Sequence, residues 1–254
     1  MNNLDRNIVN AAIENQDLGT LKQLMCNQNY IKLLDWPEAR YEEDENPEDP
    51  EEPLLKKAIE LGNVKIVDLL ITAGAKLPRW NICLNMGLEL AIHLGNEEIV
   101  QILLNAGANV HGIITPPIEN AIYGWVEPPI VCATAEGNFE LIKLLIEAGA
   151  NINSQTEGGI TPLMIAGCNG NTALVKFLVE MGADVNIVDS EGTETALYKA
   201  ACYGYEEIFN YLMPLTTSLE IRELAKACFF RRYLLKEKKE GKKTKAKLPP
   251  VNDR

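Results

Sequence analysis

Residues 159–186 read GITPLMIAGCNGN and then TALVKFLVEMGADVN, and this stretch decides how the chain folds. Thr161 can cap a helix whose first turn accommodates Pro162, because no intrahelical N–H is needed there. Gly170 suits the turn that ends this helix. From Leu174 onward, apolar residues recur at helical spacing and give a second helix one apolar face. The stretch therefore predicts a pair of short helices joined by a tight turn.

The same pattern recurs along the chain with a regular period. A small residue marks one position in six units, at Ala12, Ala58, Ala91, Ala133, Ala166 and Ala200. Three residues earlier stands an aliphatic residue, at Val9, Leu55, Leu88, Ile130, Leu163 and Leu197. Four residues later stands Gly62, Gly95, Gly137, Gly170 or Gly204, with Gln16 in the first unit. The alanines are 46, 33, 42, 33 and 34 residues apart, so two steps carry insertions of 13 and 9 residues.

The Thr-Pro-Leu-x-x-Ala motif at 161–166 and the 33-residue period resemble the ankyrin repeat family, over about residues 4–215. The resemblance implies an all-α solenoid of stacked helix-turn-helix units, in which finger loops connect one unit to the next. We expect this solenoid to span residues 1–235, with insertions at about 27–52 and 111–129. A helix from Ser218 to Leu235 would cap its C-terminal end. The remaining Lys-rich stretch, 236–254, is expected to be a disordered tail.

The charge of the chain is uneven and bears on the kind of partner it can bind. The chain has a net charge of −12, and residues 220–254 contain 12 Lys/Arg and 5 Asp/Glu, which leaves −19 for residues 1–219. An acidic solenoid repels the phosphate backbone of nucleic acid over most of its surface. The charge therefore favours a protein partner with a basic patch.

The cysteines and the terminal residues indicate a compartment. No two of the six cysteines form a C-x-x-C pair. Cys168 and Cys202 hold equivalent positions in adjacent units, which stacking places about 10 Å apart, too far for a disulfide. The N-terminal residues lack the apolar segment of a signal peptide, and no apolar run approaches the ~18 residues of a membrane span. We therefore predict reduced thiols, a cytoplasmic location and no membrane span.

No constellation of residues for catalysis, for a cofactor or for a metal stands out. His111 is expected in a polar loop, and His93 lacks an accompanying nucleophile and orienting group. Zinc-ligand spacing and a phosphate-binding loop are both missing from the sequence. The acidic run 42–52 lacks the spacing of a calcium loop and is interpreted as a solvated loop. The sequence therefore predicts a protein that is not an enzyme and that takes no cofactor and no small-molecule substrate.

The aromatic residues of the finger loops form the first candidate binding surface. All three tryptophans are expected outside the helices, in three successive fingers, and loop insertions in a solenoid often emerge on its binding face. Tryptophan and arginine are frequent anchors at interfaces. The candidates are Trp36, Tyr41, Arg79, Trp80, Tyr123 and Trp125. The alternative is that a tryptophan only fastens its loop to a neighbouring unit.

A second candidate surface follows from the resemblance to ankyrin repeats. In that family the positions just before the turn glycine face the concave side of the solenoid. Here they are Glu60, Leu61, His93, Leu94, Ala135, Glu136, Cys168, Asn169, Cys202 and Tyr203, with Tyr198 one turn earlier. The alternative is an ordinary helix surface with scattered apolar residues.

These features predict a non-catalytic protein–protein interaction module, such as an adaptor, an inhibitor or an assembly factor, that binds through finger loops and the concave face. One alternative is an enzyme whose pocket is built from the insertions and His93. Another is a protein whose basic tail binds nucleic acid or an anionic membrane surface. The tail has no aromatic residue after Tyr233, which disfavours base stacking.

Overall fold

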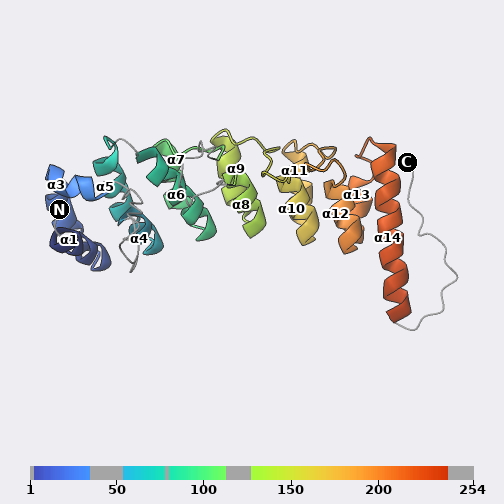
Figure 1. Ribbon diagram of the computed structural model, residues 1–254, viewed down its shortest axis with the longest axis horizontal. Helices are drawn as coiled ribbons and strands as arrows, with labels where there is room; N and C mark the ends of the chain where they lie inside the picture. The colour runs from blue at the N-terminus through green and yellow to red at the C-terminus, as the bar shows by residue number, and fades with distance from the viewer. Residues whose placement is uncertain (1–2, 35–53, 78–79, 113–126, 240–254) are drawn as a thin grey trace, which may run out of the picture. The chain divides into compact units, whose positions relative to one another are not determined.

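The computed structural model describes residues 3–34, 54–77, 80–112 and 127–239, and Figure 1 shows them as a succession of helices. Within these ranges the chain forms helices, turns and loops but no strand, which confirms the all-α prediction. The chain divides into two compact units. The first contains Met1–Pro129 and Lys143–Ala148, and the second contains Ile130–Ile142 and Gly149–Arg254.

The first unit is built from helix pairs in the order that the repeat pattern predicts. The pairs are α1 (Asn3–Glu14) with α2 (Leu18–Met25), α4 (Leu54–Glu60) with α5 (Val64–Gly74), and α6 (Trp80–His93) with α7 (Glu97–Asn105). The first helices of the pairs pack on one another, α1 on α4 and α4 on α6. The second helices do the same, α2 on α5 and α5 on α7.

The first insertion begins with structure that the sequence did not predict. Residues expected to form a loop instead form α3 (Gln28–Ile31) and a 3₁₀ turn, η1 (Lys32–Leu34). Leu33 and Leu34 are buried, and the Tyr30 hydroxyl lies 3.4 Å from Oδ1 of Asp5 in α1. Apolar burial therefore holds the start of the insertion against the first helix pairs.

The second unit continues the same arrangement. Helices α8 (Pro129–Glu136) and α9 (Phe139–Glu147) lie at the division between the units. They are followed by α10 (Pro162–Asn169), α11 (Thr172–Glu180), α12 (Ala196–Tyr203), α13 (Glu206–Leu212) and α14 (Leu219–Lys239). Helix α12 packs between α10 and α14.

Small and aliphatic residues fill the core at the positions that the repeat register predicts. The six register alanines are at most 6% exposed, and the six aliphatic residues that precede them are buried as well. Alanine lets the two helices of a pair approach closely, and the aliphatic side chains fill the space between successive pairs. This confirms the register read from the sequence.

Local signals begin and end these helices. The Thr161 hydroxyl accepts a hydrogen bond from the Met164 N–H at 3.2 Å, and Pro162 is the first residue of α10. Gly170 ends α10 with φ of 71°, and Gln16 adopts the same left-handed conformation with φ of 54°. Most second helices begin after a residue whose side-chain oxygen accepts a hydrogen bond from the N–H three residues later, at 3.0–3.3 Å. These acceptors are Asp17, Asn63, Asn96, Asn138 and Asn171.

Asparagine side chains connect one finger loop to the next in the second unit. The Asn153 side-chain oxygen accepts a hydrogen bond from the Asp184 N–H at 2.9 Å. Asn186, one repeat later, accepts from the Thr217 N–H at 2.8 Å. Each hydrogen bond spans 31 residues of sequence, so the two bonds are equivalent contacts in successive repeats.

The C-terminal helix is longer than the sequence predicted. The Ser218 hydroxyl accepts from the Ile221 N–H at 3.3 Å, as expected for its cap, and α14 packs on α12. However, α14 continues to Lys239, so placing the end of the folded region at Leu235 was wrong by four residues. Lysine and glutamate are good helix formers, and basic residues suit a helix C-terminus. No helix of the described ranges is long and apolar enough to cross a membrane.

Candidate protein-binding surface

In the first unit, the residues predicted to face a partner lie at the C-terminal ends of α4 and α6. Glu60 and His93 are the last residues of these helices, and both are exposed. Leu61 and Leu94 follow them and are 41% and 51% exposed. Two leucines thus hold the same exposed position in successive repeats.

A cavity of about 210 Å³ lies beside these residues, between α4 and α6. Its wall is almost entirely apolar, and its lining residues are Leu55, Lys56, Cys83, Met86, Gly87, Glu89, Leu90 and His93. Gly87 permits the close approach of the helices, because a Cβ there would lie 2.9 Å from Cδ1 of Ile59. The Lys56 ammonium lies 3.7 Å from Oε1 of Glu60 at the surface. The cavity has room for one large apolar side chain.

The thiol and the imidazole that line the cavity do not lie next to each other. Cys83 and His93 both line it, but they are ten positions apart on the same helix. A rise of 1.5 Å per residue separates them by about 15 Å along the axis, well beyond hydrogen-bond distance. In the part of the chain that the structure describes, no group of three His, Cys, Asp or Glu side chains could hold a metal ion.

In the second unit, the predicted positions are again the last residues of first helices. Glu136, Asn169 and Tyr203 end α8, α10 and α12, and all three are exposed. Tyr203 is 48% exposed and stacks on Tyr205 with ring centroids 6.2 Å apart. Tyr198, one turn earlier, is half-buried. The C-terminal end of this face is therefore aromatic, as the sequence indicated.

Cys168 of α10 and Lys199 of α12 act on the Tyr203 hydroxyl. A hydrogen bond with the Cys168 side chain is the main factor that raises the pKa of the Tyr203 hydroxyl above its usual value. Partial burial lowers the pKa of Lys199, but the hydrogen bond and charge of Glu194 more than offset this and leave it raised. Lys199 is therefore held as a cation beside a tyrosine that stays protonated at neutral pH.

One of the finger predictions is wrong. Trp80 is the first residue of α6 and only 5% exposed, so it is not a loop residue available to a partner. Its ring packs against Gly74 of α5, where an added Cβ would lie 2.5 Å from the ring. The other finger candidates, Trp36, Tyr41, Arg79, Tyr123 and Trp125, lie outside the described residues.

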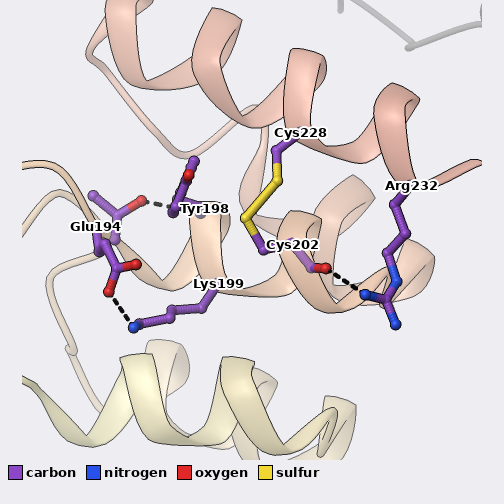
Figure 2. The surroundings of a disulfide bond; sticks show 7 residues. Glu194, Tyr198, Lys199, Cys202, Cys228 and Arg232 are labelled. Carbon is purple, nitrogen blue, oxygen red and sulfur yellow. Dashed lines mark hydrogen bonds and ion pairs between the residues drawn. A yellow bond between two sulfur atoms is a disulfide. The ribbon is translucent and has the colours of Figure 1, made fainter.

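The sequence also missed a covalent bond. Cys202, predicted to be a reduced residue on the concave side, is joined to Cys228 of α14 by a disulfide (Figure 2). The Cα atoms of the two residues are 5.5 Å apart, an ordinary separation for this bond. Cys26, Cys83, Cys132 and Cys168 take no part in a disulfide. The spacing of 26 residues carries no signal for the pair, because it depends on how α14 packs on α12.

The fold and these exposed helix ends define a helical-repeat scaffold of the kind that binds other proteins. A family model described as ankyrin repeats (3 copies) matches residues 130–223, and a single ankyrin repeat matches residues 88–114. The chain is therefore an ankyrin-repeat protein, as its sequence motifs indicated, and such repeats are generally protein–protein interaction modules. A search of the curated proteins finds no match to it.

Proposed function

We propose that the protein binds a protein partner without catalysing a reaction, through exposed side chains at the C-terminal ends of its first helices. The observation that carries this proposal is the recurrence of large apolar side chains at one repeat position. Leu61, Leu94 and Tyr203 each directly precede the turn glycine, and each is between 41% and 51% exposed. Apolar side chains that recur on one face of a scaffold are typical of a contact surface.

Burial of these exposed side chains would supply part of the free energy that binding requires. Fully burying a leucine side chain is worth about 1.5–3 kcal/mol, so covering the exposed half of Leu61 or Leu94 contributes roughly 1 kcal/mol each. Tyrosine is a frequent hot-spot residue because its ring is large and rigid. A partner that covers several of these side chains gains a few kcal/mol from them alone.

Charge supports a basic partner. Glu60 directly precedes Leu61, and Glu136 holds the repeat position of Leu94 and Tyr203; residues 1–219 carry a net charge of −19, from 12 Lys/Arg and 31 Asp/Glu. An adaptor, an inhibitor and an assembly factor would each use such a face. The remaining candidates, His93 and Asn169 on the helices and Trp36, Tyr41, Arg79, Tyr123 and Trp125 in the fingers, extend the proposed surface. A cytoplasmic location belongs to the same proposal.

The test compares two charged substitutions with a matched control. Leu94→Asp and Tyr203→Asp would each weaken capture of the partner by at least about tenfold, because they place a carboxylate in an apolar contact. The control is Met181→Asp, since Met181 is also 41% exposed but follows the second helix α11. Partners captured by the unmodified protein from cell extract are identified by mass spectrometry and then purified for titration calorimetry.

The proposal requires that substitutions at Leu94 and Tyr203 weaken binding and that the substitution at Met181 does not. Equal loss of affinity in Met181→Asp and in the two test variants would indicate general destabilisation rather than a binding face. Unchanged affinity in both test variants, with circular dichroism confirming that they are folded, would overturn the proposal.

A further inference from the structure

Helix α14 packs extensively on α12, but most of its described side chains are half-buried or exposed rather than fully buried. It has 21 residues, against 8 in α12 on which it packs. Of its residues with described side chains, Ala225 is buried, whereas Leu219, Leu224 and Tyr233 are exposed. Elements with little buried apolar surface open locally at low free-energy cost. The contacts that fasten α14 therefore decide how often it separates from α12.

A ring stack, a hydrogen bond and a disulfide are among the contacts that fasten the helix, and the last two involve Cys202 (Figure 2). The ring of Phe229 stacks on Phe209 of α13 with centroids 4.5 Å apart and an angle of 11° between the rings. Nη1 of Arg232 donates to the carbonyl oxygen of Cys202 at 2.8 Å. The disulfide from Cys202 to Cys228 is the third contact and the only covalent one among the described residues.

We propose that the Cys202–Cys228 pair is a thiol–disulfide exchange site that controls whether α14 stays on the end of the second unit. A dithiol reductant attacks one sulfur as its thiolate, the Cys202–Cys228 bond breaks, and a mixed disulfide forms. The second thiol of the reductant then releases the protein as two thiols. Two electrons and two protons pass to the protein, and the reductant leaves as its cyclic disulfide. An oxidised dithiol reverses the reaction.

Because of where the two cysteines lie, their oxidation state affects the attachment of α14 but not the stability of the preceding helix pairs. Cys202 and Cys228 are both half-buried, so a small reductant can approach the sulfurs. Leu197 and Ala200, the core residues of α12, are fully buried. The disulfide closes a loop of 26 residues that contains α13 and the start of α14. Breaking it therefore increases the freedom of this segment and leaves the preceding helix pairs in place.

Release of α14 would change the surface at the end of the second unit. Phe209 is buried in the oxidised form, where Phe229 lies against it. Separation of α14 uncovers this ring, and it also removes Arg232 from the end of α12, beside Tyr203. The reduced protein would thus present an apolar end that the oxidised protein covers.

Limited trypsin digestion of the full chain tests the proposal, because Arg222, Lys226 and Arg231 are cleavage sites within α14. The protein is equilibrated in dithiothreitol or in its oxidised form, alkylated, and digested, and cleavage at these sites is timed by mass spectrometry. We expect cleavage to be faster in the reduced protein by on the order of a hundredfold. Cys228→Ser should be cleaved rapidly in both buffers, and Cys168→Ser should behave like the unmodified protein.

Two results would overturn the inference. One is alkylation of both Cys202 and Cys228 in the oxidising buffer, which would mean that the bond does not form. The other is an equal cleavage rate in the two buffers, which would mean that Phe229 and Arg232 hold α14 without the bond. Hydrogen exchange of α10 provides a second measurement. Its protection should be the same in both buffers, and a parallel loss in α10 and α14 would also contradict the proposed local release.

Discussion

The packing of Trp80 against Gly74 can be tested directly in the first unit. Each residue can be substituted both in the unmodified protein and in a protein where the other residue is already substituted. Trp80 is nearly fully buried, and replacing a buried tryptophan by alanine costs about 3–5 kcal/mol of unfolding free energy. In Gly74→Ala, the new methyl group would lie 2.5 Å from the indole ring, and such overpacking costs about 1–3 kcal/mol.

The double variant, with Trp80→Ala and Gly74→Ala together, separates the Trp80–Gly74 contact from the effect that each substitution has by itself. Once Trp80 is alanine, the ring is gone, and Gly74→Ala should be neutral or stabilise the helix by up to about 1 kcal/mol. We therefore expect a coupling free energy of about 2 kcal/mol between the two substitutions. Trp80→Phe is the matched control, since Trp80 Nε1 has no hydrogen-bond partner among the described residues and phenylalanine retains a ring.

Urea unfolding followed by circular dichroism measures the unmodified protein and the four variants, because the helix signal does not depend on tryptophan. If Gly74→Ala costs the same free energy with and without the Trp80 ring, the indole does not pack where the structure places it. If Trp80→Ala costs less than about 1 kcal/mol, Trp80 is not part of the core.

Three further predictions concern the repeats. Ala166→Leu should lower the unfolding free energy by roughly 1–3 kcal/mol, because Ala166 is fully buried between helices; an unchanged melting temperature would contradict this register. Asn96→Ala should cost about 1 kcal/mol by removing the cap of α7, whereas Asn105→Ala, at the other end of that helix, should cost less in the same urea titration. Hydrogen bonds from the Glu194 and Thr193 N–H groups lower the pKa of Asp189, so the ionised carboxylate stabilises the fold above the unfolded-state pKa of about 3.9. That stabilisation should be lost as pH falls through the lower folded-state pKa. The unmodified protein and Asp189→Asn should therefore converge in unfolding free energy at acid pH. A difference between them that stays constant with pH would contradict this linkage.

The repeat architecture could be predicted because its signals are local. Thr161, Pro162 and Gly170 start and end α10 through contacts within one turn, and the buried alanines recur at a fixed period. The cap residues of the second helices carry an equally local signal. An asparagine precedes α5, α7, α9 and α11 in the sequence, and the same reasoning could have identified it.

The features that the sequence did not predict depend on contacts between distant segments. The repeat pattern accounts for the last seven residues of α6, but the helix begins earlier, at Trp80, where Gly74 of another helix leaves room for the indole ring. Likewise, Cys228 reaches Cys202 because of the way α14 packs on α12. No spacing rule encodes either contact.

The sequence identified which candidate residues lie at the ends of helices, but it did not predict how exposed each side chain is. Glu60, His93, Glu136, Asn169 and Tyr203 are each the last residue of a helix, which follows from the position of the turn glycine. The cavity beside Leu55 and Met86 could not be foreseen, because its volume depends on the distance between α4 and α6 that Gly87 permits.

The asparagine hydrogen bonds between finger loops have a consequence for how such a chain can grow. The side-chain oxygens of Asn153 and Asn186 each accept a hydrogen bond from the loop that follows, 31 residues later. A duplicated segment that carries its own asparagine would therefore receive one such bond from the loop before it and supply one to the loop after it. The array can be lengthened by whole modules in evolution or by genetic splicing, since no existing loop would lose its connection.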